Sequence, residues 1–386
     1  MDFSFDDIQT MLADSIGKFI DNDYDFETRQ ANAGSKTGYD PAVWRTFAEL
    51  GWTAVPFAED DGGIGGGPIE LMIVMREFGR GLVVEPYLAN VVLAGGVLRR
   101  AATAGQKREW LSPMIAGELQ TTLAFAEPQA RYDIANVVTR AEQRGTDYVL
   151  NGRKAVVPNG ANAELIIVPA RTSGAQTDRA GITLFAVPAA SEGLTRKAYA
   201  TVDGQRAAEL LLDGVRLAPS AILGEPGAGF ATLDAAVDDA TFAVAAEAVG
   251  IMRTLTDKTV EYSKNRIQFG VPIGSFQALQ HRMVDMLTAC EQTYSLLTWA
   301  SMLAADGTAD AKRAISSLKY QVGTAGREVG EEAVQLHGGM GVSWELDIAH
   351  YFKRLTTIGQ MFGNADWHLD RLADRLADRL AHRPAE

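Results

Sequence analysis

The spacing of apolar residues changes twice along the chain, and this change constrains the fold more than any other feature of the sequence. From Phe3 to about Arg100, stretches such as IQTMLADSIGKFI repeat apolar residues at helical spacing, which predicts amphipathic helices. From about Thr121 to Glu225 the apolar runs are short, β-branched and separated by turn pairs, which predicts strands. After Gly229 the helical spacing returns in long stretches.

This order predicts an α+β fold with three domains. We expect an N-terminal α-helical domain over residues 1–118, a small β-barrel or sandwich over 119–228, and a C-terminal four-helix bundle over 229–386. Within the β domain, Asn151-Gly152 stands between two apolar runs, and this pair is typical of a type I′ hairpin turn. The last helix is expected to begin near Ala365 and to carry a stripe for packing, formed by Leu369, Leu372, Leu376 and Leu380.

Composition excludes several classes of protein. A hydrophobic fraction of 47% with 22% charged residues is ordinary for a globular chain. A formal net charge of −13 argues against nucleic-acid binding, which needs clustered Lys and Arg. The acidic N-terminus does not resemble a secretory signal, and the most apolar window, residues 240–252, contains Glu247 and is shorter than the roughly 20 residues that span a bilayer. We therefore expect a cytoplasmic protein with no membrane span.

The sequence contains neither the spacing of a metal site nor a nucleotide-binding motif. Cys290 is the only cysteine, so we expect no intrachain disulfide and no cysteine-based metal site. No GxGxxG or GxxxxGK[ST] sequence is present, which argues against a Rossmann or P-loop site. The histidines have no metal-binding spacing, and we expect no metal site on them: His281, His337, His350, His368 and His382.

One connector between two predicted helices is richer in side chains than a connector needs. The stretch FGVPIGSFQALQ, residues 269–280, breaks a helix at Gly270, Pro272 and Gly274. It nevertheless carries two aromatic residues, Phe269 and Phe276, and two glutamines, Gln277 and Gln280.

Five stretches, in this order, resemble the acyl-CoA dehydrogenase family over essentially the whole chain. AFAEPQARYD matches the place of the family's Thr-Glu-Pro-x-x-Gly-Ser-Asp segment, and VLNGRKAVVPNG matches Leu-Asn-Gly-x-Lys-x-Trp-Ile-Thr-Asn-Gly. Each stretch alone is weak evidence, but five in order at the family's spacing are strong evidence. They are LGWTAVPFAEDDGGIGGG (50–67), AFAEPQARYD (124–133), VLNGRKAVVPNG (149–160), the connector after Arg266, and QLHGGMGV (335–342).

The resemblance implies a role for the connector. In the family this turn reaches across a subunit interface to the FAD of a neighbouring chain. Arg266 and Gln268 would donate to the FAD pyrophosphate, since a guanidinium offers a planar fork of donors, and Phe269 would pack on the dinucleotide. The QLHGGMGV stretch would lie against the same cofactor, because glycines permit close approach of the backbone, at Gln335, Gly338 and Gly339.

The chain's own flavin contacts depart from the family pattern. The resemblance places Phe125, Ala126 and Val156 at the flavin. Ala126 stands where the family has a threonine, Tyr132 where it has a serine, and Val156 where it has a tryptophan. These replacements remove hydrogen-bonding groups and a stacking surface.

The catalytic base of the family is also missing from its two usual positions. Active members remove an α-proton of the acyl-CoA with a glutamate, usually in a Tyr-Glu-Gly-Thr sequence, and Phe362 replaces that glutamate. Some branches carry the base on the first C-terminal helix, where this chain has Ala240-Thr241. Asp239, together with Asp238, lies just upstream, but one helical position turns a side chain by about 100°. Asp239 is therefore a weak candidate, and the favoured explanation is that an acid near a helix N-terminus complements the helix macrodipole.

The resemblance implies FAD-dependent α,β-dehydrogenation of an acyl-CoA thioester. The pattern of lost and retained motifs is similar to the small or β subunit of heteromeric acyl-CoA dehydrogenases for dicarboxylyl-CoA or sterol side-chain substrates. A second family subunit would then be the partner, and electron-transferring flavoprotein the electron acceptor. Three alternatives stay open: a self-sufficient homotetramer using an acid such as Asp239, a non-catalytic scaffold, and a flavin monooxygenase or nitroalkane oxidase of the same fold. The acyl group is not defined by the sequence.

Overall fold

The computed structural model describes residues 4–381, with side-chain surroundings given through residue 374. Its contacts divide the chain into two compact units, and each is described here by itself. Unit 1 comprises Met1–Arg29, Gly67–Val83 and Thr241–Glu386, and unit 2 comprises Gln30–Gly66 and Val84–Ala240.

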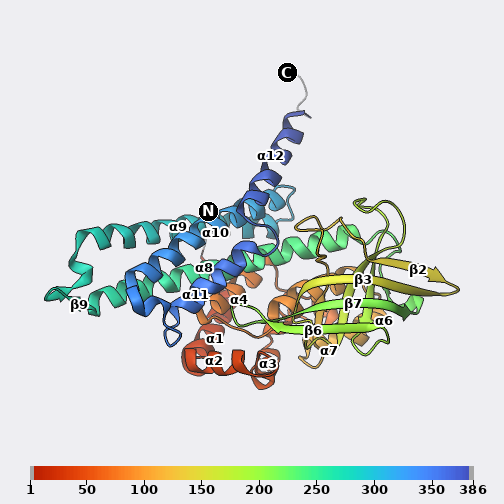
Figure 1. Ribbon diagram of the computed structural model, residues 1–386, viewed down its shortest axis with the longest axis horizontal. Helices are drawn as coiled ribbons and strands as arrows, with labels where there is room; N and C mark the ends of the chain where they lie inside the picture. Colours follow the sequence, from red (N-terminus) through yellow and green to blue (C-terminus); the bar gives the residue numbers. More distant parts are fainter. Residues whose placement is uncertain (1–3, 382–386) are drawn as a thin grey trace. The chain divides into compact units, whose positions relative to one another are not determined.

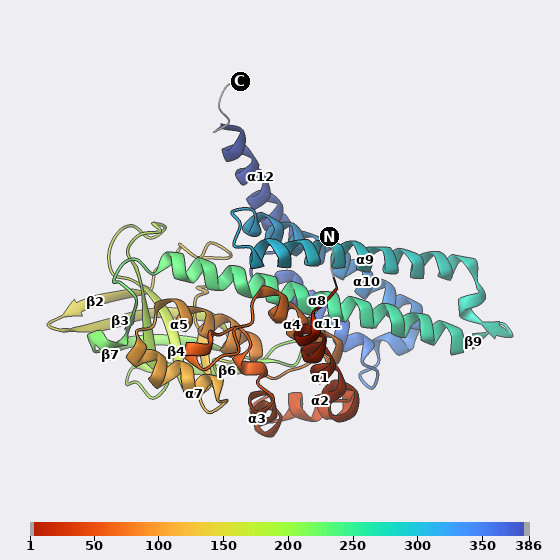
Figure 2. The same ribbon diagram turned by 180° about the vertical axis from the view of Figure 1, so that it is seen from behind.

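Unit 1 is helical (Figures 1 and 2). Its first helix begins with a capping box, in which the Asp6 carboxylate accepts the Gln9 N–H at 2.8 Å and the Gln9 side chain accepts the Asp6 N–H at 3.2 Å. Two of its helices, α2 and α8, continue into unit 2. The helices are α1 (Asp7–Asp23), α2 (Phe26–Gly34), α4 (Pro68–Gly81), α8 (Phe230–Asn265), α9 (Gln277–Ala305), α10 (Ala311–His337), α11 (Ile348–Gln360) and α12 (Ala365–Ala381).

Helices α4 and α8 touch through their backbones. A Cβ atom on Gly79 would lie 2.0 Å from the carbonyl oxygen of Glu247, and one on Gly250 would lie 2.0 Å from that of Arg76, so only glycine fits at either position. The Glu247 carboxylate is buried, and Arg354 of α11 binds it with both Nε and Nη2, at 2.6 and 2.7 Å. This bidentate pair compensates the charge of Glu247, which is the one charged residue in the apolar stretch 240–252 of α8.

Unit 2 combines short helical turns with a β-sheet. The helical elements are α3 (Pro41–Glu49), the 3₁₀ turns Trp52–Ala54 and Glu59–Asp61, a π-helix at Leu88–Ala94, α5 (Gly95–Ala101), α6 (Ala104–Gln106), a second π-helix at Lys107–Leu111, and α7 (Ser112–Ile115). The strands are β1 (Thr121–Leu123), β2 (Arg140–Arg144), β3 (Asp147–Pro158), β4 (Leu165–Arg171), β5 (Ile182–Pro188), β6 (Leu194–Ala200), β7 (Arg206–Leu217) and β8 (Ile222–Leu223).

These strands form one eight-stranded sheet in the order β6-β7-β3-β2-β4-β5-β8, with β1 beside β4. β4 pairs in parallel with β1 and β2, and the other pairs are antiparallel. Apolar side chains of the strands form a buried core cluster, which includes Leu150, Ile166, Phe185 and Leu210. The α+β class and the order helical, β, helical are confirmed.

The predicted hairpin at Asn151-Gly152 is wrong. Both residues lie inside the continuous strand β3, where Asn151 pairs with Arg140 and its side chain accepts the N–H of Gly214 at 2.8 Å. Gly152 has a positive φ of 157°, which residues with a side chain rarely adopt, and a Cβ atom there would lie 2.4 Å from the Thr139 hydroxyl. The glycine therefore serves close packing at a bulge, and not a reversal of the chain.

The last two helices of the chain, α11 and α12, bear on two further predictions. The sequence analysis placed no helix between the QLHGGMGV stretch and Ala365, and the structure has α11 there. In α12, Leu369 is half exposed, whereas Leu376 and Leu380 lie outside the residues whose side chains are described.

Candidate functional site

The connector between α8 and α9 is a two-stranded hairpin. β9 (Ile267–Gln268) pairs with β10 (Val271–Pro272), and Phe269 and Gly270 between them have φ values of 54° and 82°. Two successive positive φ angles give a type I′ turn, which is costly for a phenylalanine. Phe269 is 93% exposed, and its ring meets that of Phe276 edge-on at 6.1 Å. The hairpin thus presents a large apolar ring to the outside of unit 1.

Arg266 and Gln268 stand at the base of this hairpin. Both side chains are exposed, and the Gln268 amide donates to the carbonyl of Ile267 at 2.7 Å. Within the described part of the chain, no carboxylate forms an ion pair with Arg266. An exposed guanidinium with no carboxylate partner suits an external anion such as a phosphate.

The structure brings the two predicted cofactor stretches of unit 1 together. Tyr262, one turn before Arg266, stacks on His337 with ring centroids 4.3 Å apart and points its hydroxyl at the His337 carbonyl. Gly338 follows with a φ of 60°, and a Cβ atom on Gly338 or Gly339 would meet nothing within 4 Å. The ends of α8 and α10 therefore lie side by side, with open space beside both glycines. Gln335 lies in the last turn of α10 and is exposed.

Phe362 occupies a loop that is held by its backbone. Phe362 and Gly363 have φ values of 55° and 110°. His368 Nε2 donates to the Phe362 carbonyl at 3.1 Å, and Lys319 Nζ donates to the Gly363 carbonyl at 2.8 Å. A Cβ atom on Gly363 would lie 2.4 Å from the Trp367 ring. The loop at residues 361–364 is thus tightly fixed, and Phe362, where the resemblance implies a glutamate in active members, carries an apolar side chain.

Both side chains that hold this loop are fully buried and poorly solvated. Burial lowers the pKa of Lys319 to about 7. Burial, with the nearby Lys319, lowers the pKa of His368 to about 3, so its imidazole is neutral at physiological pH. His368 Nδ1 is buried and has no hydrogen-bond partner among the described residues.

In unit 2, the weak candidate base Asp239 is engaged by two arginines. Its Oδ2 lies 2.6 Å from Arg99 and 2.8 Å from Arg100, both on α5. Ala240, the second family position for the base, is completely buried. Both arginines contact the same carboxylate oxygen, so the structure shows Asp239 as part of an ion-pair cluster with α5.

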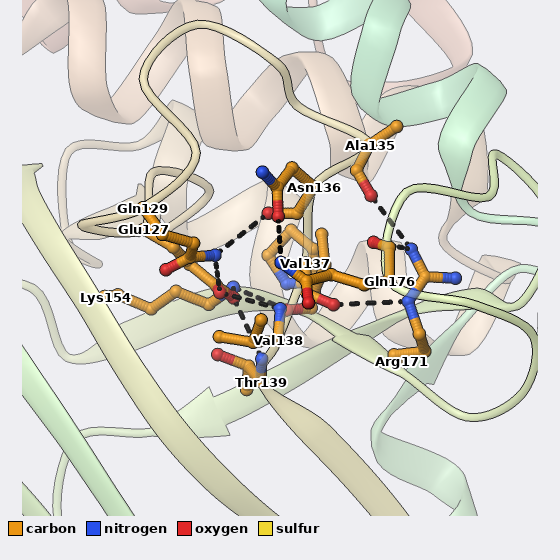
Figure 3. A network of polar contacts seen from close by, with 11 residues as sticks. Glu127, Gln129, Ala135, Asn136, Val137, Val138, Thr139, Lys154, Arg171 and Gln176 are labelled. Carbon is orange, nitrogen blue, oxygen red and sulfur yellow. Dashed lines mark hydrogen bonds and ion pairs between the residues drawn. The ribbon is translucent and has the colours of Figure 1, made fainter.

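The segment expected at the flavin is organised by a buried ion pair (Figure 3). The Glu127 carboxylate accepts Lys154 Nζ at 2.6 Å and the N–H groups of Val138 and Thr139 at 2.8 and 3.2 Å. Lys154 also donates to the Pro169 carbonyl at 2.7 Å. Burial raises the pKa of Glu127, but Lys154 and the hydrogen bonds outweigh it, and the pKa is lowered overall. Residues 127 and 154 are therefore a structural pair inside the sheet.

A second buried cation, Arg171, ties this segment to the loop between β4 and β5 (Figure 3). Its guanidinium donates to carbonyls of Ala135 and Val137 on one side, at 2.9 and 3.2 Å. On the other side it donates to the backbone carbonyls of Gln176 and Asp178, at 2.9 and 3.0 Å. The Gln176 amide completes the link by donating to the side-chain oxygen of Asn136 at 2.7 Å.

The strand expected beside the flavin ring has few free donors. Val156 is 58% exposed and has a φ of 49°, in a bulge of β3 against β7. Its N–H donates to Glu209 Oε1 at 3.1 Å, and that oxygen also accepts the Tyr199 hydroxyl at 3.0 Å. Pro158, which stands where the family motif has threonine, has neither a hydroxyl nor an N–H. Ala126 and Phe125 nearby are half-buried, and the Ala126 carbonyl accepts the Ala155 N–H.

These observations test the residues against FAD. The exposed Arg266 fits the pyrophosphate of FAD, and the open backbone at Gly338 and Gly339 leaves room for it. Val156 and Pro158 do not fit an isoalloxazine ring. The Val156 N–H already donates to Glu209, and Pro158 has no N–H to donate.

Several residues that organise the site were missed by sequence analysis. Lys319 lies on the buried face of α10 in the stretch ISSLKYQV, and Arg171 ends the apolar run LIIVPAR. A lone cation on an otherwise apolar stretch is a signal that could have identified both. His368 and Pro158 had no distinguishing pattern.

No group of three or more His, Cys, Asp or Glu side chains within residues 4–381 could hold a metal ion. No helix in this range is long and apolar enough to cross a membrane.

The chain matches known proteins over most of its length. Three family models match: "Acyl-CoA dehydrogenase, N-terminal domain" at residues 6–118, "middle domain" at 122–215 and "C-terminal domain" at 227–377. The curated protein "Probable acyl-CoA dehydrogenase YngJ" of Bacillus subtilis is 30% identical over 368 residues, covering 93% of this chain and 96% of that protein. The chain belongs to the acyl-CoA dehydrogenase family of flavoproteins.

Solved structures agree with this assignment. "Tcur3481-Tcur3483 steroid ACAD G363A variant" is 29% identical with a TM-score of 0.86, covering 97% of this chain and 99% of that one. The "ChsE4-ChsE5 complex from Mycobacterium tuberculosis" is 26% identical with a TM-score of 0.88, covering 100% of each chain. "PigA with FAD and proline" is 25% identical with a TM-score of 0.91, covering 98% and 100%. The prediction of FAD as the cofactor is confirmed.

Proposed function

We propose that this chain is the base-lacking subunit of a heteromeric, FAD-dependent acyl-CoA dehydrogenase. The observation that carries the proposal is the loop at residues 361–364. Its backbone is fixed by Lys319 and His368, yet the side chain at the family's base position is Phe362, which cannot accept a proton. The other usual position is Ala240, and Asp239 is bound by two arginines.

The division of labour follows from which residues remain exposed. In this proposal Arg266, Gln268, Phe269 and the Gly338-Gly339 backbone contact the FAD of a partner subunit. When bound, FAD supplies the hydride acceptor of the family's reaction. The partner chain carries the glutamate, and this chain contributes phosphate-binding donors and an apolar ring.

Two structural relatives support a heteromeric assembly. Both structures are named after two proteins, ChsE4-ChsE5 and Tcur3481-Tcur3483, and the second is named a steroid ACAD. The proposal therefore includes a bulky acyl-CoA, such as a sterol side-chain thioester, as the substrate. It also includes electron-transferring flavoprotein as the acceptor and the cytoplasm as the location.

A visible spectrum tests the proposal. We expect the chain purified alone to lack a flavin spectrum and to leave acyl-CoA substrates unchanged. Co-expressed with the family member of the same organism that retains the glutamate, it should yield a yellow complex that is bleached by an acyl-CoA. A flavin spectrum of the isolated chain that is bleached by an acyl-CoA would instead establish a self-sufficient enzyme.

A further inference from the structure

His350 lies where two segments of unit 1 that are far apart in the sequence meet. Its ring meets the Phe26 ring, at the start of α2, edge-on with centroids 5.1 Å apart. It also meets the Trp344 ring, in the loop before α11, edge-on with centroids 4.6 Å apart. His350 itself is almost completely buried, with 3% of its surface exposed. The imidazole therefore joins α2 to the loop at residues 343–347.

Both ring nitrogens of His350 take part in this junction. Nε2 lies 3.2 Å from the Trp344 carbonyl oxygen, and Nδ1 lies 3.5 Å from Arg29 Nη1. A carbonyl oxygen can only accept and a guanidinium can only donate, so Nε2 carries the proton and Nδ1 is the acceptor. Only the neutral imidazole, with its one proton on Nε2, satisfies both neighbours.

The charges around the imidazole also favour its neutral form. Burial is the largest cause of the lowered pKa of His350, and the cations Arg29 of α2 and Lys353 of α11 add to it. Asp347, which precedes α11, is a carboxylate that opposes them. Lys258 of α8 lies 2.9 Å from Asp347 and compensates that carboxylate. The electrostatic balance in this part of unit 1 therefore disfavours a positive charge on His350.

We infer that His350 is an acid-sensitive latch between α2 and the 343–347 loop. Protonation would place a second donor on Nδ1, opposite the Arg29 guanidinium, and would add a positive charge near Arg29 and Lys353. This arrangement is unfavourable in a buried site, because donor then faces donor and the like charges repel. The imidazole would turn away from Arg29, and Trp344 would lose its ring contact and its hydrogen bond. The inference does not depend on the proposed function.

The direction of the pH effect follows from the lowered pKa of His350. Above a pH of about 6.5 the imidazole is neutral in both the closed and the open form of the junction, so the contact has its full stability. As the pH falls below this value, the open form binds the proton first, because only the closed form has the lowered pKa. Mild acid should therefore open the junction.

Hydrogen exchange of the full chain, followed by mass spectrometry, measures the junction locally. Peptides that cover residues 24–29 and 343–350 should lose protection by about fivefold or more between pH 7.5 and pH 5, after correction for the intrinsic exchange rate. A peptide from the buried strand β4, residues 165–171, should keep its protection. His350→Gln has an amide that can accept from Arg29 and donate to Trp344 but cannot titrate. This variant should keep both peptides protected at pH 5.

His281→Gln is the matched control, because His281 is an exposed histidine of unit 1 on α9. Its hydrogen exchange should follow that of the wild type at both pH values. The imidazole resonances of His350 give a separate measure of the charge effect. Arg29→Gln and Lys353→Gln should each raise the pKa of His350 toward that of a free histidine, which a merely structural role of His350 does not predict. Circular dichroism at pH 7.5 checks the fold of each variant.

Four outcomes would overturn the inference. Full protection of both peptides in the wild type at pH 5 would show that the junction stays closed. An equal loss of protection in the wild type and in His350→Gln would mean that another group titrates. A loss that extends equally to residues 165–171 would show general unfolding. If His350→Gln does not fold, the two charge variants decide, and an unshifted pKa of His350 in both would remove the electrostatic mechanism.

Discussion

The Glu127–Lys154 pair gives the sharpest prediction on stability. Both side chains have no exposed surface, and their charged atoms are 2.6 Å apart. Glu127→Gln keeps the shape of the side chain but removes the charge that compensates the buried ammonium. Breaking a buried pair at one partner costs about 3–5 kcal/mol, because the other charge stays buried. Lys154 would keep only the Pro169 carbonyl and an amide oxygen as acceptors. We therefore expect Glu127→Gln to lower the free energy of unfolding by that amount at pH 7.

Urea unfolding followed by circular dichroism measures this cost. Because the uncompensated Lys154 can release its proton, the cost of Glu127→Gln should be smaller at pH 9 than at pH 7. The control is Arg144→Ala, which breaks an ion pair with Glu142 whose side chains are 63% and 60% exposed. That change should cost less than about 1 kcal/mol. A loss below about 1 kcal/mol for Glu127→Gln, equal to the control, would refute the reasoning.

Three other predictions follow from the site. The isolated chain should not dehydrogenate any acyl-CoA in a dye-reduction assay, and turnover that Asp239→Asn abolishes would contradict this. Arg266→Ala should weaken FAD retention in the complex about ten- to over a hundredfold, measured by absorbance after dialysis, with partial rescue by Arg266→Lys; full occupancy would exclude the contact. His368 has a folded pKa of about 3, below its unfolded value, so its contribution to stability is complete above pH 6.5 and is lost as the pH falls. Between pH 7 and pH 5 this loss should be about 2 kcal/mol in the wild type and absent in His368→Gln, measured by urea unfolding.

The fold was largely predictable because apolar spacing reports which face of an element is buried. The helices after Gly229 and the strands after Thr121 follow directly from it. The prediction at Asn151-Gly152 failed because the same dipeptide serves two purposes. There the glycine was needed for the approach of Thr139, the residue just before β2, to β3, and these two residues are 13 positions apart in the chain. Local sequence does not carry that information.

The candidate site was only partly predictable. Roles could be predicted for Phe362, Ala240 and Arg266 because a family motif gives each of them a position, and those roles stay predictions. The contacts made by Lys319 and Arg171 could not be predicted. Both side chains donate to backbone carbonyls, which every residue has and which no sequence pattern identifies. The pairing of Asp239 with Arg99 and Arg100 was hidden for another reason. It joins residues about 140 positions apart.

Anchoring of the 361–364 loop through carbonyl oxygens separates its shape from the identity of residue 362. Lys319 and His368 bind atoms that every amino acid has, so replacing the side chain at this position leaves both hydrogen bonds in place. An acidic side chain and a phenyl ring can therefore both occupy position 362 without loss of these two hydrogen bonds. Such a site can lose its chemistry while the protein continues to accumulate in the cell, and this is the condition under which duplicated copies of one gene can take on unequal roles.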